Sequence, residues 1–270
     1  MKSILVPTDF SANTQTALEY AIDLANQFAC KLILFNTYKL SHRAGMFIGV
    51  ERMMRDESKE LMEETLEKTQ KKLNEGVLLE GKVAKGEAVS TIIRAAKKLE
   101  VSMIVMATQG ASGLKEVFIG STTNGVMIGS KAPVLVVPSE FDYYPFRTIA
   151  LYADEKMVLN KRSFEALRMI VSRYDASICA FYIGTKTDTV ADTVNDSLSG
   201  ILEGIKFSFH EIAGDDKDIN QKIKDFVKSE NADMLCMIKR NRGFWDRLFS
   251  NSVTTKEVFH SNVPILVLHD

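Results

Sequence analysis

Short apolar runs alternate with longer amphipathic segments along the first half of the chain. The apolar runs are predicted to be buried strands, at residues 3–7, 32–36, 77–84, 102–107 and 134–137. The segments between them carry apolar residues at helical spacing and are predicted helices, at residues 12–28, 51–74, 88–99 and 122–130. Strands that alternate with helices form a parallel sheet covered on both faces, and right-handed crossovers restrict the topology to a doubly wound open sheet. The pattern therefore predicts an α/β domain with a five-stranded parallel open sheet flanked by helices.

The second half of the chain repeats this order. Residues 149–154 align with residues 4–9, and residues 263–268 align with residues 132–137. Between these anchors the second half is shorter, because the polar stretch 185–204, which has little periodicity, stands where the first half has a long charged helix. We expect two tandem copies of one fold, with a first domain at 1–139, a linker at 140–146 and a trimmed second domain at 147–270.

Composition narrows the functional classes. The chain has 46% hydrophobic and 26% charged residues, which is typical of a globular protein and excludes a disordered one. Its net charge of −1 gives no overall field that would attract nucleic acid or an anionic membrane. The apolar runs at 134–137 and 234–238 are far shorter than the roughly 20 residues that span a bilayer. The odd number of cysteines, three, indicates a reducing compartment, so we expect buried free thiols and a cytoplasmic protein.

Ligands of an open parallel sheet bind beside the carboxyl ends of its strands, so the residues at those ends are the candidates for chemistry. They are Pro7, Thr8 and Asp9 after the first strand, Thr108, Gln109 and Gly110 after the fourth, and Gly120, Ser121, Thr122 and Thr123 at the start of the last helix. A glycine followed by hydroxyl residues at a helix amino terminus presents free backbone N–H groups and the positive end of the helix dipole, which together favour phosphate. Two plainer interpretations stay open: Ser121 as an ordinary helix cap, and Asp9 as a cap of the turn into the first helix.

These residues together resemble the universal stress protein family, whose pattern is G-x2-G-x9-G-[S/T]. Gly110 is followed after nine residues by Gly120 and Ser121, and the resemblance extends over the whole chain as a tandem pair. It implies an adenine nucleotide alpha hydrolase-like fold in both domains. The first glycine of the pattern is Ala107 here. If that position needs positive φ or close ligand contact, a methyl group weakens binding; if it needs only a small residue, alanine serves.

The resemblance also implies roles for residues that match the family pattern. Asp9, with the backbone of Pro7 and Thr8, would face the adenosine end of an adenine nucleotide, and Thr37 would offer its backbone to the base. Residues beside the nucleotide would be Met106, Ala107 and Gln109, and those that cradle the phosphates would be Gly110, Gly120, Ser121, Thr122 and Thr123. The implied ligand is ATP, or alternatively AMP or ADP, and Mg²⁺ could accompany the phosphates.

The second copy lacks the pattern. Asn241 and Asn251 stand opposite Gly110 and Gly120, and only Ser252 is retained, opposite Ser121. We therefore expect one nucleotide site per chain and a second domain that serves as a structural partner. The fusion would internalise a pseudo-dimer, with the strands at 134–137 and 265–268 pairing, and tandem chains could pair again as homodimers.

No catalytic group stands out at this predicted site. The four histidines have no metal-ligand spacing, and the one candidate carboxylate, Asp9, is expected at the adenosine end of the ligand. Hydrogen-bond donors without a general base are typical of a binding protein rather than of an enzyme. The resemblance thus implies a universal stress protein whose first domain binds ATP and which acts as a nucleotide-responsive binding protein in the stress response. Two alternatives stay open: a slow metal-dependent ATP hydrolase, and a protein-interaction module without a ligand.

Overall fold

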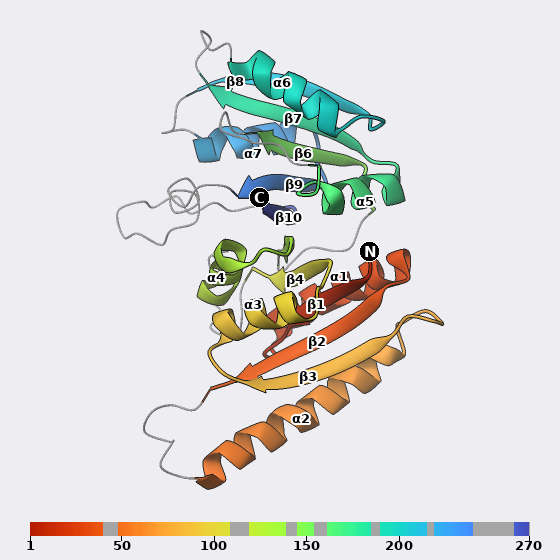
Figure 1. The fold of residues 1–270 in the computed structure, drawn as a ribbon, viewed down its shortest axis with the longest axis vertical. Helices are drawn as coiled ribbons and strands as arrows, with labels where there is room; N and C mark the ends of the chain where they lie inside the picture. The colour runs from red at the N-terminus through yellow and green to blue at the C-terminus, as the bar shows by residue number, and fades with distance from the viewer. Residues whose placement is uncertain are drawn as a thin grey trace. The chain divides into compact units, whose positions relative to one another are not determined.

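Each half of the chain carries its own parallel sheet with helices on both faces (Figure 1). The computed structural model describes residues 1–39, 48–108, 119–138, 145–153, 161–184, 190–214, 219–239 and 262–269. The chain divides into two compact units, Met1–Glu140 and Phe141–Asp270. The parallel strands and the helices that cover them confirm the predicted α/β class.

The first unit is built on five described strands, in the order β3-β2-β1-β4-β5. These are β1 (Ser3–Pro7), β2 (Lys31–Tyr38), β3 (Leu79–Lys85), β4 (Met103–Ala107) and β5 (Val134–Val137). The pairings β1–β2, β1–β4, β2–β3 and β4–β5 are all parallel. All residues of β1, β4 and β5 are buried, because helices cover both faces of the sheet.

Four helices cover this sheet: α1 (Ala12–Phe28), α2 (Ile48–Gln70), α3 (Ala88–Lys98) and α4 (Ser121–Gly129). α1 packs on β1 and β4 and α2 on β2 and β3, whereas α3 and α4 pack on each other (Figure 1). The strands step from β1 outward to β3 and then return to β4, so right-handed crossovers place α1 and α2 on one face and α3 and α4 on the other.

Glycines mark the closest helix contacts in this unit. A Cβ at Gly81 of β3 would lie 2.8 Å from Cγ of Met62, so α2 lies directly on this strand. A Cβ at Gly125 of α4 would lie 2.8 Å from Cγ2 of Val89, and one at Gly129 would lie 2.5 Å from Cδ1 of Ile93. The contact between α3 and α4 is therefore closer than any larger side chain at these two positions would allow.

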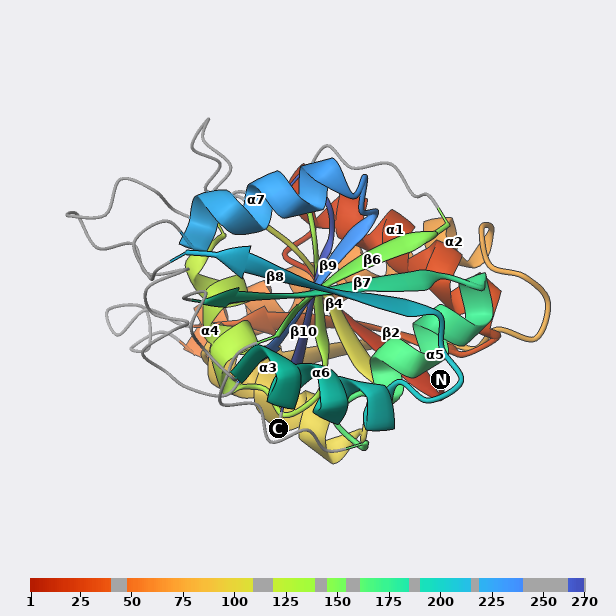
Figure 2. The same ribbon diagram turned by 90° about the horizontal axis from the view of Figure 1, so that it is seen from above.

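Residues 240–261, between β9 and β10, lie outside the described part of the second unit. Its described elements follow the order of the first unit as far as β9. They are β6 (Thr148–Ala153), α5 (Glu165–Tyr174), β7 (Ser177–Gly184), α6 (Val190–Ile201), β8 (Phe207–Ala213), α7 (Ile219–Ser229), β9 (Met234–Lys239) and β10 (Ile265–His269). The strand order is β10-β9-β6-β7-β8, with parallel pairings throughout. Figure 2 shows α7 on one face of these strands and α5 and α6 on the other. α6 has 12 described residues, whereas α2 has 23.

The helix α6 was not predicted from the sequence. The stretch 185–204 has many Thr, Asp, Asn and Ser residues, which have modest helix propensity, and this composition obscured its apolar positions. Ala191, Val194, Leu198 and Ile201 nevertheless follow one another at steps of three and four residues, and all four are buried. Tertiary packing of this stripe therefore stabilises a helix that propensity alone does not indicate.

The three cysteines are free thiols. Cys30 and Cys236 are buried, as expected, whereas Cys179 is half-buried. Burial raises the pKa of Cys30 to about 11 and also raises the pKa of Cys236 and Cys179, so all three stay protonated and unreactive near neutral pH. None of the helices in the described part of the chain combines the length and apolar character needed to cross a membrane.

Candidate functional site at the carboxyl ends of β1 and β4

The strand order of the first unit reverses between β1 and β4. The chain moves from β1 to β2 and β3 on one side and then to β4 and β5 on the other. In doubly wound sheets the connections on the two sides of this switch point diverge and leave a crevice beside the carboxyl ends of the central strands. Here those ends are Pro7 of β1 and Ala107 of β4.

Three of the predicted site residues lie on one face of the sheet at this edge. Leu5 pairs with Ile104, so Pro7 and Met106, each two residues further on, point to the same side. Leu34 of β2 pairs with Gly81, which faces α2; Thr37, three residues later, therefore points to the opposite face, that of α3 and α4. Val6 pairs with Leu34, so Pro7 points to that α3 and α4 face as well. The fold thus places Pro7, Thr37 and Met106 on the same face of the sheet at this edge.

Hydrogen bonds fix the end of β1. The amide of Thr8 donates to the carbonyl of Phe35 at 3.0 Å, and Nδ2 of Asn36 donates to the carbonyl of Thr8 at 2.9 Å. The next turn is tight, because the amide of Phe10 donates to Oγ1 of Thr8 at 2.9 Å and Phe10 has a φ of +62°. A phenylalanine with a left-handed backbone conformation is uncommon, so the surrounding contacts stabilise this turn.

Asp9 organises the loop that leads into α1. Its Oδ1 accepts hydrogen bonds from the amide of Ser11 at 3.1 Å, from Oγ of Ser11 at 2.6 Å and from Oγ1 of Thr14 at 3.1 Å. The side chain is exposed at the edge of the sheet. The interpretation of Asp9 as a residue that caps the turn into the first helix is therefore correct, and any contact with a ligand would come in addition to this role.

The amino terminus of α4 is anchored at the end of β4. The amide of Gly120 donates to the carbonyl of Thr108 at 2.5 Å, and Oγ1 of Thr123 donates to the carbonyl of Ala107 at 2.8 Å. The amide of Asn124 makes a helical bond to the carbonyl of Gly120 at 2.9 Å. The amides of Ser121, Thr122 and Thr123 precede this first helical hydrogen bond, so the helix itself offers them no acceptor. No side chain of the described residues caps the helix. Such a terminus is suited to an anion.

The sequence places Thr108 directly after the fourth strand but assigns it no role in binding. Its side chain is 4% exposed, and among the described residues its Oγ1 has no hydrogen-bond partner. A buried hydroxyl without a partner costs free energy unless something else satisfies it. Oδ1 of Asn36, which is 6% exposed, is in the same situation within the described part of the chain. The position of Thr108 directly after a buried strand, before Gln109 and Gly110, was the available signal.

Ala107 occupies the place of the first glycine in the family pattern without backbone strain. It is the last residue of β4, it is buried, and its φ is not among the positive values that the structure shows for non-glycine residues. The backbone at this position therefore does not require glycine. Gln109 and Gly110 lie outside the described residues, as do Asn241, Asn251 and Ser252 of the second copy.

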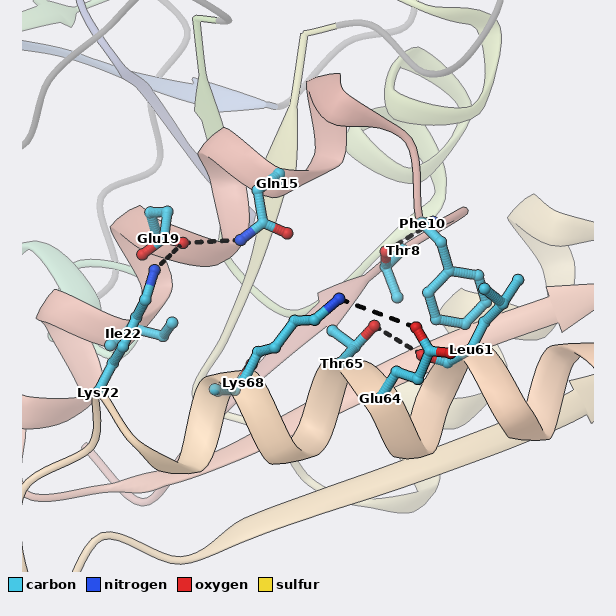
Figure 3. Close-up of a pocket in the computed structure, with 11 residues that line it drawn as sticks. Thr8, Phe10, Gln15, Glu19, Ile22, Leu61, Glu64, Thr65, Lys68 and Lys72 are labelled. Carbon is cyan, nitrogen blue, oxygen red and sulfur yellow. Dashed lines mark hydrogen bonds and ion pairs between the residues drawn. The ribbon is translucent and has the colours of Figure 1, made fainter.

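A pocket of about 150 Å³ lies on the other face of the sheet, between α1 and α2 (Figure 3). Its lining comes from Thr8, Phe10, Gln15, Glu19 and Ile22 on one side and Leu61, Glu64, Thr65, Lys68, Thr69 and Lys72 on the other. Of the predicted site residues, this lining includes only Thr8. The pocket is therefore distinct from the edge formed by Pro7, Thr37 and the amino terminus of α4.

The described residues include no group of three or more His, Cys, Asp or Glu side chains arranged to hold a metal ion. At the α4 edge the groups available to a ligand are backbone amides and hydroxyls. This arrangement can bind an anion and orient it, because such donors need no proton transfer to act.

Comparison with known proteins first defines the structural class. The chain resembles the crystal structure of a universal stress protein from Archaeoglobus fulgidus DSM 4304, with a TM-score of 0.72 and 24% identity, covering 98% of this chain and 95% of that one. This similarity shows a shared fold over both units.

The sequence then identifies the family. The model of the universal stress protein family matches residues 1–138 and 197–269, and the chain belongs to this family. One relative is universal stress protein MJ0531 of Methanocaldococcus jannaschii, 30% identical over 138 residues, which span 50% of this chain and 81% of that protein. Another is universal stress protein YxiE of Bacillus subtilis, 31% identical over 143 residues, which span 50% of this chain and 97% of that protein.

Proposed function

We propose that the first unit binds an adenine nucleotide, ATP in the simplest case, at the carboxyl ends of β1 and β4. The observation that carries this proposal is the amino terminus of α4. It begins at the switch point of the sheet beside the buried hydroxyl of Thr108, which has no hydrogen-bond partner among the described residues, and its Ser121, Thr122 and Thr123 amides precede the helical bond from Asn124. A phosphate at this place would accept from those amides and from the Thr108 hydroxyl.

The nucleoside would extend along the sheet edge toward β1 and β2. Pro7 and Thr37 point to the same face as α4, and Asp9 follows directly after this strand end. The base would lie against Pro7 and the backbone of Thr37, with Asp9 near the ribose. Gln109 and Gly110 would complete the phosphate cradle, as the family pattern implies. Any Mg²⁺ would be carried by the phosphates, with Asp9 as the nearest candidate carboxylate.

The function that follows is that of a nucleotide-responsive binding protein in the stress response, located in the cytoplasm. Membership of the universal stress protein family supports the stress-related role, and the donor set without a general base among the described site residues supports binding rather than catalysis. The second unit would act as a structural partner without a nucleotide of its own.

Titration calorimetry with ATP tests this proposal. The substitution Gly120→Val places a branched side chain at the helix cap, where a phosphate has to approach, and is expected to abolish the binding heat. Gly200→Val is the matched control, because a Cβ at Gly200 of α6 meets nothing within 4 Å. Binding that survives Gly120→Val, or wild-type protein that releases no heat at about 1 mM ATP, contradicts the proposal.

A further inference from the structure

The pocket between α1 and α2 has no role in the proposed nucleotide site. Thr8 points into it, whereas Pro7, one residue earlier in β1, points to the opposite face of the sheet. Phe10 also lines it, from the left-handed turn that directly follows Asp9. A ligand in this pocket would therefore contact the same loop as the nucleotide from the other side of the sheet.

The lining of the pocket combines apolar side chains with hydroxyls. Its apolar side chains are Ile22, which is buried, Phe10, which is half-buried, and Leu61, which is exposed, and Thr8 and Thr65 supply hydroxyl groups. Both hydroxyls are engaged, because Oγ1 of Thr65 donates to the carbonyl of Leu61 at 2.7 Å and Oγ1 of Thr8 accepts from the amide of Phe10. With a volume of about 150 Å³, the space accommodates a molecule of roughly the size of benzene.

The rim of the pocket carries two ion pairs, which differ in the distance between their charged atoms. Oε1 of Glu19 lies 2.5 Å from Nζ of Lys72 and also accepts from Nε2 of Gln15 at 2.7 Å, so this pair joins α1 to the end of α2. Oε2 of Glu64 and Nζ of Lys68 are 3.8 Å apart, which is too long for a direct hydrogen bond. Figure 3 shows the Lys68 side chain extending over the pocket toward Glu64.

We propose that this pocket binds a free α-amino acid with a small branched apolar side chain, such as valine or leucine. The carboxylate of the ligand would accept from Nζ of Lys68, its ammonium group would donate to Glu64, and its side chain would pack against Phe10, Ile22 and Leu61. The Glu64–Lys68 pair has one group of each sign, so it favours a zwitterion over a molecule with a single charge. The proposal is independent of nucleotide binding.

Calorimetric titration with L-leucine and two analogues tests the ligand class. The acid 4-methylpentanoate keeps the carbon skeleton and the carboxylate but lacks the ammonium group, and isopentylamine keeps the ammonium group but lacks the carboxylate. We expect one leucine bound per chain, and roughly two- to fivefold weaker binding of either analogue, because each makes one ionic contact fewer with the exposed Glu64–Lys68 pair. Equal affinity for the three compounds, or no binding of leucine at millimolar concentration, would overturn the proposal.

Two pairs of substitutions on α2 locate the site. Glu64→Gln with Lys68→Met removes both charges at the pocket rim and is expected to weaken leucine binding by roughly tenfold or more. Glu67→Gln with Lys71→Met removes two exposed charges of opposite sign that do not line the pocket, and this variant should bind leucine as the wild type does. Equal loss in both variants would place the binding elsewhere, and circular dichroism verifies that both variants are folded.

Discussion

Oγ1 of Thr123 donates a hydrogen bond of 2.8 Å to the carbonyl oxygen of Ala107, across 16 residues of sequence. The bond joins the first turn of α4 to the last residue of β4, and both residues are buried. Together with the bond from the amide of Gly120 to the carbonyl of Thr108, it holds the helix terminus at the sheet edge. The proposed phosphate position therefore depends on a side chain whose own hydroxyl is directed at the protein backbone.

The substitution Thr123→Val tests this anchoring role. Valine keeps the shape of threonine but leaves the carbonyl of Ala107 without this donor, so the free energy of unfolding should fall by about 1 kcal/mol. ATP should also bind more weakly, because the start of α4 is no longer fixed. Urea unfolding and calorimetry measure the two effects. Thr122→Val, at a half-buried neighbouring position, is the control and should leave stability near that of the wild type.

The close contact between α3 and α4 predicts a stability effect that is independent of any ligand. Gly125→Val should lower the free energy of unfolding by about 1–3 kcal/mol, because the new side chain overlaps Val89 and this β-branched neighbour has little rotamer freedom. Gly200→Val, at an open position of a helix, should change it by less than about 0.5 kcal/mol. Thermal unfolding compares the melting temperatures of the two variants. Equal melting temperatures would contradict the close α3–α4 contact.

Glu80 should contribute stability that depends on pH. Hydrogen bonds from Lys31 and Lys82 lower the pKa of this carboxyl group below its ordinary value in the folded state. A lowered folded-state pKa means that the stabilisation is present above the ordinary pKa of a glutamate and is lost as the pH falls through the folded-state value. Glu80→Gln should therefore reduce stability at pH 7 but not in strong acid. Denaturant unfolding over this pH range, with Glu63→Gln as an exposed control, measures the difference.

Asp23 of α1 should act with the opposite sign. Burial and the nearby Glu19 raise the pKa of this carboxyl group, against the smaller opposing effect of Lys72. Because the folded state favours the protonated form, stability should fall as the pH rises from the ordinary aspartate pKa through the raised value. Asp23→Asn should accordingly increase stability at pH 7 and leave it unchanged in acid. A decrease at pH 7 would mean that Asp23 has a stabilising partner that outweighs its desolvation.

The sequence predicted those elements whose apolar pattern is unambiguous. The strands Ser3–Pro7 and Val134–Val137 and the helix Ala12–Phe28 have the predicted bounds, because each is buried along one continuous run or one helical stripe. The charged helix was predicted at 51–74 and observed at Ile48–Gln70, since its exposed faces tolerate almost any polar residue and give no end signal.

The candidate site was predictable only in part. The hydroxyl cluster at Ser121, Thr122 and Thr123 follows from the sequence, because helix capping is local. That the Thr108 hydroxyl has no partner among the described residues could not be predicted locally, since it depends on what packs around the end of β4. The pocket between α1 and α2 was also missed, because its lining comes from two helices whose separation is set by the strands beneath them.

The glycine contacts between α3 and α4 have a mechanical consequence. Gly125 and Gly129 bring the two helix backbones so close that α4 cannot tilt without displacing Val89 and Ile93. A movement at the amino-terminal end of α4 would thus be transferred to α3. The exposed side of α3 carries Arg94, Lys97 and Lys98, so such a movement would displace a cluster of positive charge on the protein surface.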